Sequence, residues 1–124
     1  MFSLNQRFLL ASRSGVEPIE ALLRDHPGLN VNCRAGGEGW TALHTASSRG
    51  NFAVVKFLLA QPGIDVNSQS LRGQVPLEIA CRGNKVSVVE LLVKDPSVNA
   101  AFAKPDRRTS LWYASLLGHV EVIE

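Results

Sequence analysis

The 124-residue sequence has few charges, few aromatic residues and only two cysteines. Charged residues make up 19%, and 13 Lys and Arg against 11 Asp and Glu leave a formal charge of +2 with no basic block in either half. Because binding to a phosphate backbone requires clustered Lys and Arg, we expect no nucleic-acid partner. Cys33 and Cys81 are isolated in the sequence, which indicates neither a disulfide framework nor a zinc site.

Long hydrophobic runs are also missing. The longest contain four residues, whereas a membrane-spanning helix needs about 20. The first residues, Met-Phe-Ser-Leu-Asn-Gln-Arg, lack the basic start and apolar core of a signal peptide. We therefore expect a soluble intracellular chain, in the cytoplasm or the nucleus, with no membrane span.

The sequence does contain an internal repeat, built from an apolar fraction of 45%. The block Thr41-Ala-Leu-His-Thr-Ala46 returns 34 residues later as Val75-Pro-Leu-Glu-Ile-Ala80, and again after 34 as Thr109-Ser-Leu-Trp-Tyr-Ala114. An upstream copy, Gln6-Arg-Phe-Leu-Leu-Ala11, precedes the first of these by 35 residues. A fixed period of this length is the signature of a repeat architecture, in which stacked neighbours bury each other's apolar faces.

One repeat can be interpreted from its local signals. Thr41 is a helix N-cap, and Gly50 stands where the chain must turn left-handed at the helix end. Asn84, in the equivalent place, is the next best tolerated residue there. A second helix is predicted over Phe52–Leu59, followed by Pro62-Gly63, an extended Ile64–Asn67 and a turn around Arg72-Gly73.

The Thr-Ala-Leu-His-x-Ala block, with Gly50-Asn51 and the following Val-Val and Leu-Leu pairs, resembles the ankyrin repeat. The resemblance implies an all-α repeat solenoid of stacked helix-turn-helix units joined by β-hairpin-like loops. We expect a single domain over residues 1–124, with repeats at about 4–32, 33–67, 68–99 and a truncated fourth at 100–124. The fourth copy stops within its second helix, which suggests that the chain is the start of a longer protein.

The resemblance also implies that Thr41 and His44 form hydrogen bonds at the corner between loop and helix and brace adjacent repeats. Other copies depart from this pattern: Leu9, Glu78 and Trp112 replace the histidine, and Gln6 and Val75 replace the threonine. We expect His44 and Cys81 to have structural roles. No pattern of nucleophile, base, metal ligands or phosphate loop is present, so we predict no enzyme activity, no cofactor and no metal.

Members of this family contact other proteins through a concave groove formed by hairpin tips and first helices. Aligned to that pattern, eight residues are candidate protein-binding residues: Glu38, Trp40, Arg49, Arg72, Gln74, Arg82, Asp106 and Arg108. Trp and Arg often dominate interface energetics. For Trp40 the alternative is packing over the neighbouring hairpin. The arginines form either a mildly basic stripe for an acidic peptide or ordinary solvated charges.

The predicted function is therefore a monomeric, non-enzymatic module that binds a partner protein. The alternative is a targeting or regulatory segment of a larger enzyme, channel or effector. Direct nucleic-acid binding is a third and weaker interpretation. Separately, Leu59-x5-Asp65-Val66-Asn67 resembles the substrate pattern of the asparaginyl hydroxylase that modifies ankyrin repeats, which makes Asn67 a candidate modification site.

Overall fold

The computed structural model describes residues 3–34 and 36–98. These residues form six helices and no β-strand: α1 (Leu4–Ala11), α2 (Val16–Asp25), α3 (Ala42–Arg49), α4 (Phe52–Leu59), α5 (Pro76–Arg82) and α6 (Val86–Lys94). The predicted second helix at Phe52–Leu59 is thus confirmed at both ends. The predicted fourth copy, which contains Asp106, Arg108 and Trp112, lies outside the described residues.

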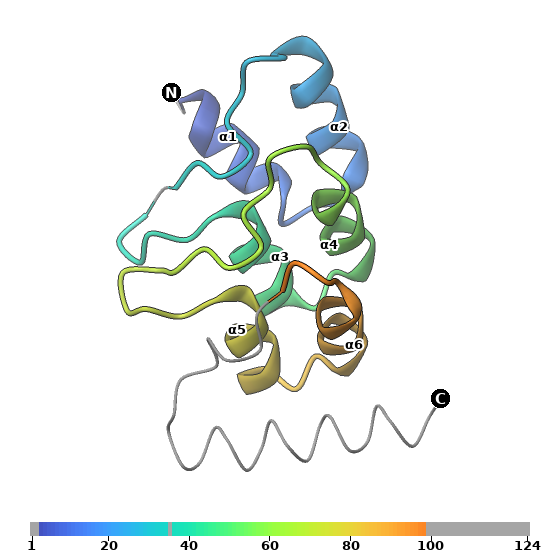
Figure 1. Ribbon diagram of the computed structural model, residues 1–124. Helices are drawn as coiled ribbons and strands as arrows, with labels where there is room; N and C mark the ends of the chain where they lie inside the picture. Colours follow the sequence, from blue (N-terminus) through green and yellow to red (C-terminus); the bar gives the residue numbers. More distant parts are fainter. Residues whose placement is uncertain (1–2, 35, 99–124) are drawn as a thin grey trace.

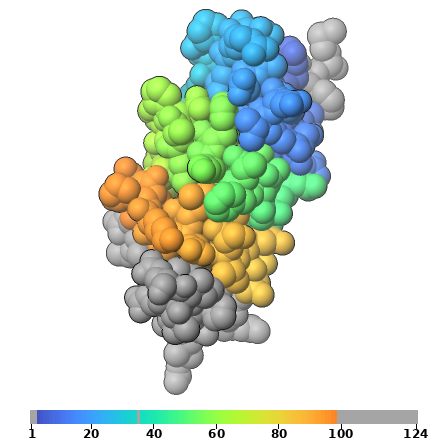
Figure 2. All heavy atoms as spheres, turned by 90° about the vertical axis from the view of Figure 1, so that its right-hand side faces the viewer, coloured from blue at the N-terminus to red at the C-terminus, as the bar shows by residue number. Residues whose placement is uncertain are grey.

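The helices form two stacked rows (Figure 1). In the first row α1 packs on α3 and α3 on α5, while in the second row α2 packs on α4 and α4 on α6. Each helix also contacts its partner in the same pair. Seen from the side of the second row, successive pairs lie as bands from the N-terminal blue to orange (Figure 2). This arrangement confirms the predicted all-α repeat solenoid.

The three first-row helices begin in different ways. Thr41 caps α3, as predicted, in a capping box with His44, whereas α5 has Pro76 in its first turn and no side-chain cap from Val75. The copy that was aligned from Gln6 starts its helix differently, because Ser3 caps α1 and Gln6 completes that capping box. The helix starts one turn earlier because Ser3 and Gln6 together satisfy backbone N–H groups that would otherwise lack partners.

The turns after α3 and α5 use the left-handed conformation predicted for Gly50 and Asn84. Gly50 has φ 69° and Asn84 has φ 56°. Asn84 is the one non-glycine residue with positive φ among the described residues. Since this conformation crowds a Cβ against the backbone, glycine and asparagine are the residues that tolerate it best. The local signal therefore positions the second helix of the second and third pairs, α4 and α6.

The core runs through the whole stack instead of having one centre. Its apolar members recur at equivalent places in successive helix pairs, so that each pair shares its buried side chains with its neighbours. The fully buried large ones include Phe8, Leu43 and Leu77 in the first row, and Ile19, Val54, Val88, Leu58 and Leu92 in the second. Stability is consequently distributed over the interfaces between pairs.

The loops after α2 and α4 repeat a hydrogen-bonding pattern. The segment predicted to be extended over Ile64–Asn67 instead turns at Val66-Asn67, where the Asn67 N–H donates to Asp65 Oδ1 at 3.1 Å. The Asn67 side chain donates from Nδ2 to the Ser97 carbonyl at 2.8 Å, and Asn32 Nδ2 donates to the Gly63 carbonyl at the same distance. These asparagines tie each loop to the next.

Candidate functional site

His44 links the start of α3 to the following loop. Its Nδ1 accepts from the Thr41 backbone N–H at 3.1 Å, and its Nε2 lies 2.9 Å from the Gln74 carbonyl oxygen. A backbone N–H can only donate and a carbonyl can only accept, so the ring is the neutral tautomer with its proton on Nε2. The expected structural role of His44 is therefore confirmed.

Burial keeps this ring neutral. Desolvation is the largest cause that lowers the pKa of His44 below its ordinary value, and the charge of Arg34 lowers it further. The Gln74 carbonyl and Asp65 act in the opposite direction but do not outweigh burial. Protonation would also place a second N–H on Nδ1, facing the Thr41 N–H, so the cationic form fits this site poorly.

At the equivalent position of α5 stands Glu78, whose side chain is fully buried. Its Oε1 lies 3.7 Å from Nε of Arg82, one turn later in the same helix. A buried carboxylate requires a compensating charge, because desolvation of an unpaired ion is costly. Arg82, one of the candidate binding residues, therefore also has a structural contact.

Arg34 joins the loop between α2 and α3 to the loop between α4 and α5. The sequence analysis did not identify it as a candidate residue. Its guanidinium donates to the Gly39 carbonyl at 2.8 Å, to Ser68 Oγ at 2.6 Å and to the Gln69 carbonyl. These acceptors lie in two different loops, and two of them are backbone atoms. No residue-type pattern along the chain could have identified them, although the approximate repeat spacing of Arg34 and Ser68 is visible in the sequence.

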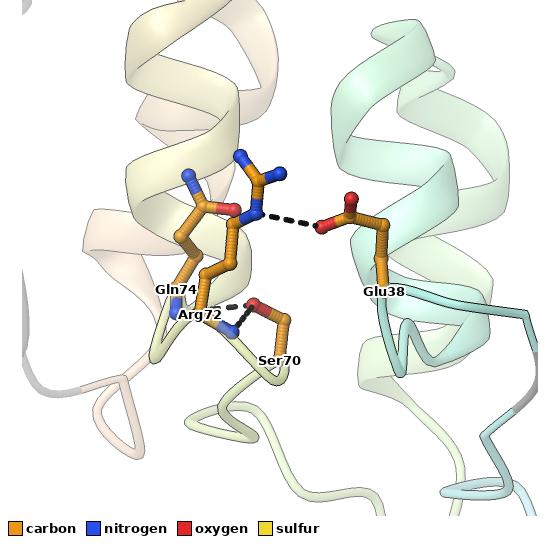
Figure 3. Close-up of polar contacts among 4 residues, drawn as sticks. All are labelled: Glu38, Ser70, Arg72 and Gln74. Atoms are coloured by element: carbon orange, nitrogen blue, oxygen red, sulfur yellow. Dashed lines mark hydrogen bonds and ion pairs between the residues drawn. The ribbon is translucent and has the colours of Figure 1, made fainter.

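The tips of the same two loops meet at Glu38 and Arg72. Arg72 Nε lies 3.3 Å from Glu38 Oε2, and the Leu71 N–H donates to the Glu38 carbonyl at 2.9 Å. Ser70 Oγ accepts from the backbone N–H groups of Arg72 and Gln74 and so shapes the tip (Figure 3). Arg72 and Glu38 point toward each other from adjacent loops (Figure 3).

Leu71 is the side chain at this tip that sequence reasoning missed. It is 76% exposed, the most exposed of the large hydrophobic residues described. Its Cγ is close enough to Gly39 that a Cβ there would lie 2.9 Å away. The available signal was an apolar residue beside the predicted turn at Arg72-Gly73, a place where polar residues predominate.

Trp40 stacks on His44, with ring centroids 6.3 Å apart and planes inclined by 23°. Its Nε1 is shielded from solvent and has no acceptor among the described residues. Trp40 also lines a hollow with Arg13, Thr45, Ser48 and Arg49. Trp40 therefore packs on His44 and also lines a surface hollow.

The remaining candidate residues have different surroundings. Arg49 is exposed at the end of α3, whereas Gln74 is half-buried and presents its backbone carbonyl to His44. The structure thus brings Glu38, Arg72 and Gln74 together at the loop tips and places Trp40 with Arg49. Arg82 is engaged with Glu78 on α5. Asp106 and Arg108 lie outside the described residues.

Comparison with known proteins accounts for this architecture. Residues 8–59 match a family described as ankyrin repeats (many copies), and residues 72–101 match the ankyrin repeat. The chain belongs to the ankyrin repeat family. Ankyrin repeats are protein-interaction modules, and their fold is not itself catalytic. The resemblance to the ankyrin repeat that the sequence showed is therefore confirmed.

Several relatives contain a similar ankyrin segment. The chain is 35% identical over 118 residues to the probable E3 ubiquitin-protein ligase XBOS31 of Oryza sativa subsp. japonica, covering 94% of this chain and 26% of that protein. It is 32% identical to the I-Kappa-B like protein C2 of Microplitis demolitor bracovirus, covering 70% and 49%. It is 40% identical to the human SMC5-SMC6 complex localization factor protein 1, covering 68% and 8%. The chain spans half or less of each of these relatives.

The two cysteines of the ankyrin array are both buried. Burial, reinforced by the nearby charge of Glu78, raises the pKa of Cys81 to about 12, and burial also raises the pKa of Cys33. A thiol with such a pKa is a poor nucleophile at neutral pH. Within residues 3–34 and 36–98, no group of three or more His, Cys, Asp or Glu side chains is placed to hold a metal ion.

None of the described ankyrin helices exceeds ten residues, and none is long and apolar enough to cross a bilayer.

Proposed function

We propose that this ankyrin array binds a partner protein through the surface formed by its loop tips and first-row helices. The family's role in protein interaction supports this proposal, and so does the character of the loop tips. The observation with most weight is the cluster of Leu71, Arg72 and Glu38, where a leucine that is 76% exposed lies beside an exposed ion pair on two adjacent loops. The exposed leucine offers apolar area to a partner, and arginine is a residue type enriched among interface hot spots.

The proposed surface includes all eight candidate residues, but their contributions differ. Arg72 and Glu38 neutralise each other in the free protein, so a partner must compete with or extend this pair. Arg82 is partly committed to Glu78. Arg49 and Trp40 adjoin a hollow between helices. Asp106 and Arg108, at the expected fourth loop, extend the same proposed surface by alignment alone.

Site-specific photo-crosslinking tests this proposal. A photoreactive phenylalanine analogue in place of Leu71 is expected to cross-link the partner in cells that express the chain, and the same analogue at Lys56, on α4 in the other row, is not. The double variant Trp40→Ala with Arg72→Ala is expected to reduce capture of that cross-linked protein. Cross-linking from position 56 and not from position 71 would contradict the proposed surface.

A second proposal is that the array recruits partners for a larger protein. The relatives support this, because the matched segment makes up 26% and 8% of two of them. One of those is named as a probable E3 ubiquitin-protein ligase, and about three quarters of its length lies outside the matched segment. The sequence encoded on either side of the chain is the direct test. Flanking coding sequence with no further domain would contradict this second proposal.

A further inference from the structure

Two adjoining hollows lie between α1, α3 and the loop that connects α2 to α3. The first has a volume of about 300 Å³ and includes Leu9, Leu10 and Trp40 in its lining. The second has a volume of about 260 Å³ and is lined partly by Ser48 and Arg49. Arg13, Trp40 and Thr45 line both hollows, which we treat as two parts of one groove. We call this the α1–α3 groove; its helices are labelled in Figure 1.

The end of the α1–α3 groove at α1 is apolar. Leu10 is 40% exposed, although it is a large hydrophobic residue, and Leu9 is half-buried beside it. The Trp40 ring completes this end and is held in place by its stacking on His44. His44 is in turn fixed by hydrogen bonds to Thr41 and Gln74. An aromatic ring held by stacking next to one exposed and one half-buried leucine can receive an apolar side chain with little loss of conformational entropy on the protein's side.

The groove is also basic: Arg13 lines both hollows, and Arg49 lines the second. Arg13 and Arg49 are both exposed, and within the described ranges neither forms an ion pair. They differ in this from Arg72 and Arg82, which contact Glu38 and Glu78. None of the described residues that line the groove is acidic. Two arginines without a counter-charge favour a carboxylate, which a guanidinium binds through paired charge-assisted hydrogen bonds.

We propose that the α1–α3 groove binds an extended peptide segment of the partner that combines an apolar side chain with a nearby Asp or Glu. The apolar side chain lies against Trp40 and Leu10, and the carboxylate binds Arg13 and Arg49. This inference rests on the proposed function and specifies the chemistry of the bound segment. It concerns a surface separate from the tip cluster of Leu71, Arg72 and Glu38.

The test begins with selection of a phage-displayed random dodecapeptide library on the whole chain. The expected consensus has an Asp or Glu within a few residues of Leu, Ile, Phe or Trp. A fluorescein-labelled consensus peptide is then titrated by fluorescence anisotropy against wild type and against Arg13→Glu with Arg49→Glu. Affinity is expected to fall at least tenfold in this double variant and to weaken with salt, because the two exposed arginines act electrostatically.

A matched control has the same change in net charge elsewhere. Arg24→Glu with Lys56→Glu alters one basic residue in the last turn of α2 and one in the last turn of α4, as Arg49 is in the last turn of α3. This control is expected to bind within twofold of wild type, and thermal melting monitors the folding of both variants. Replacing the peptide's Glu with Gln, or its Asp with Asn, is expected to weaken binding to wild type but not to the Arg13 and Arg49 double variant.

Several results would overturn the inference. These are a selection with no acidic-apolar consensus, no enriched peptide at all, or binding that the Arg13 and Arg49 changes leave intact. If selected peptides lose binding on Arg72→Ala but not on the groove changes, the inference fails while the proposed function stands. If neither peptide selection nor cross-linking from position 71 detects a ligand, both fail.

Discussion

The Nε2 of His44 and the carbonyl oxygen of Gln74 form a 2.9 Å hydrogen bond between the second helix pair and the loop that leads to the third. The bond is buried at the histidine and requires a neutral ring, because Nδ1 must accept from Thr41 while Nε2 donates. The same ring supports Trp40 in the α1–α3 groove. One side chain thus couples helix capping, repeat stacking and the proposed binding surface.

The pH dependence of stability follows from this ring. The pKa of His44 is lowered in the folded protein, chiefly by burial, from an ordinary value of about 6.5. Between these two values the unfolded chain binds more protons, so the free energy of unfolding falls as pH decreases from about 6.5 to the folded pKa. Urea unfolding at several pH values should show this decline, and His44→Gln should reduce it.

Proton NMR of the histidine rings provides the direct check. The His44 resonance should titrate with a midpoint below 6.5. A His44 midpoint at or above 6.5 would contradict the assignment of a neutral buried ring.

The caps of α3 and α5 make a reciprocal pair of predictions. Thr41→Val should lower the free energy of unfolding by about 1–2 kcal/mol, because it removes the hydroxyl that accepts from the His44 N–H and contacts Nδ1. Val75→Thr should raise it by about 1 kcal/mol, because α5 has no side-chain cap and the new hydroxyl can accept from the Glu78 N–H. Chemical denaturation measures both, and equal effects of the same sign would refute the capping argument.

Gly39 should tolerate substitution poorly. It is buried, has φ 66°, and a Cβ would lie 2.9 Å from Leu71 Cγ. Gly39→Ala should therefore cost about 1–2 kcal/mol through backbone strain and displace the exposed Leu71 side chain. Gly37→Ala is the control, since its Cβ would meet nothing within 4 Å and its φ is not in the left-handed region; it should change stability by less than about 0.5 kcal/mol. Similar melting curves for the two variants would contradict this prediction.

The thiols should resist alkylation in the folded state. With its pKa raised to about 12, Cys81 has almost no thiolate at pH 8, and Cys33 is also buried with a raised pKa. Mass spectrometry after iodoacetamide treatment at pH 8 should show little modification of native protein and two modified cysteines in guanidinium chloride. Rapid native labelling of Cys81 would show that its segment opens readily.

Much of the fold could be predicted because its signals are local. Thr41 as N-cap, Pro76 in a first turn, and Gly50 and Asn84 in the left-handed conformation depend on backbone groups within one helical turn, and all are confirmed. The start of α1 depends on another local signal, because Ser3, one turn before Gln6, is the N-cap of that helix. The spacing of the motifs identified the repeat, whereas the capping residues determine where α1 starts.

The candidate surface depended more on the tertiary structure. Sequence by itself determined the period, the helix pairs and the loops in which Glu38 and Arg72 lie, because periodic burial and turn residues act along the chain. Only stacking decided that Arg72 pairs with Glu38, that Arg34 spans two loops, and that Arg13 shares a groove with Arg49. Apart from the local contact of Arg34 with Gly39, these pairs lie about one repeat apart in the sequence. Their geometry is determined by how helix pairs pack, which no local backbone signal specifies.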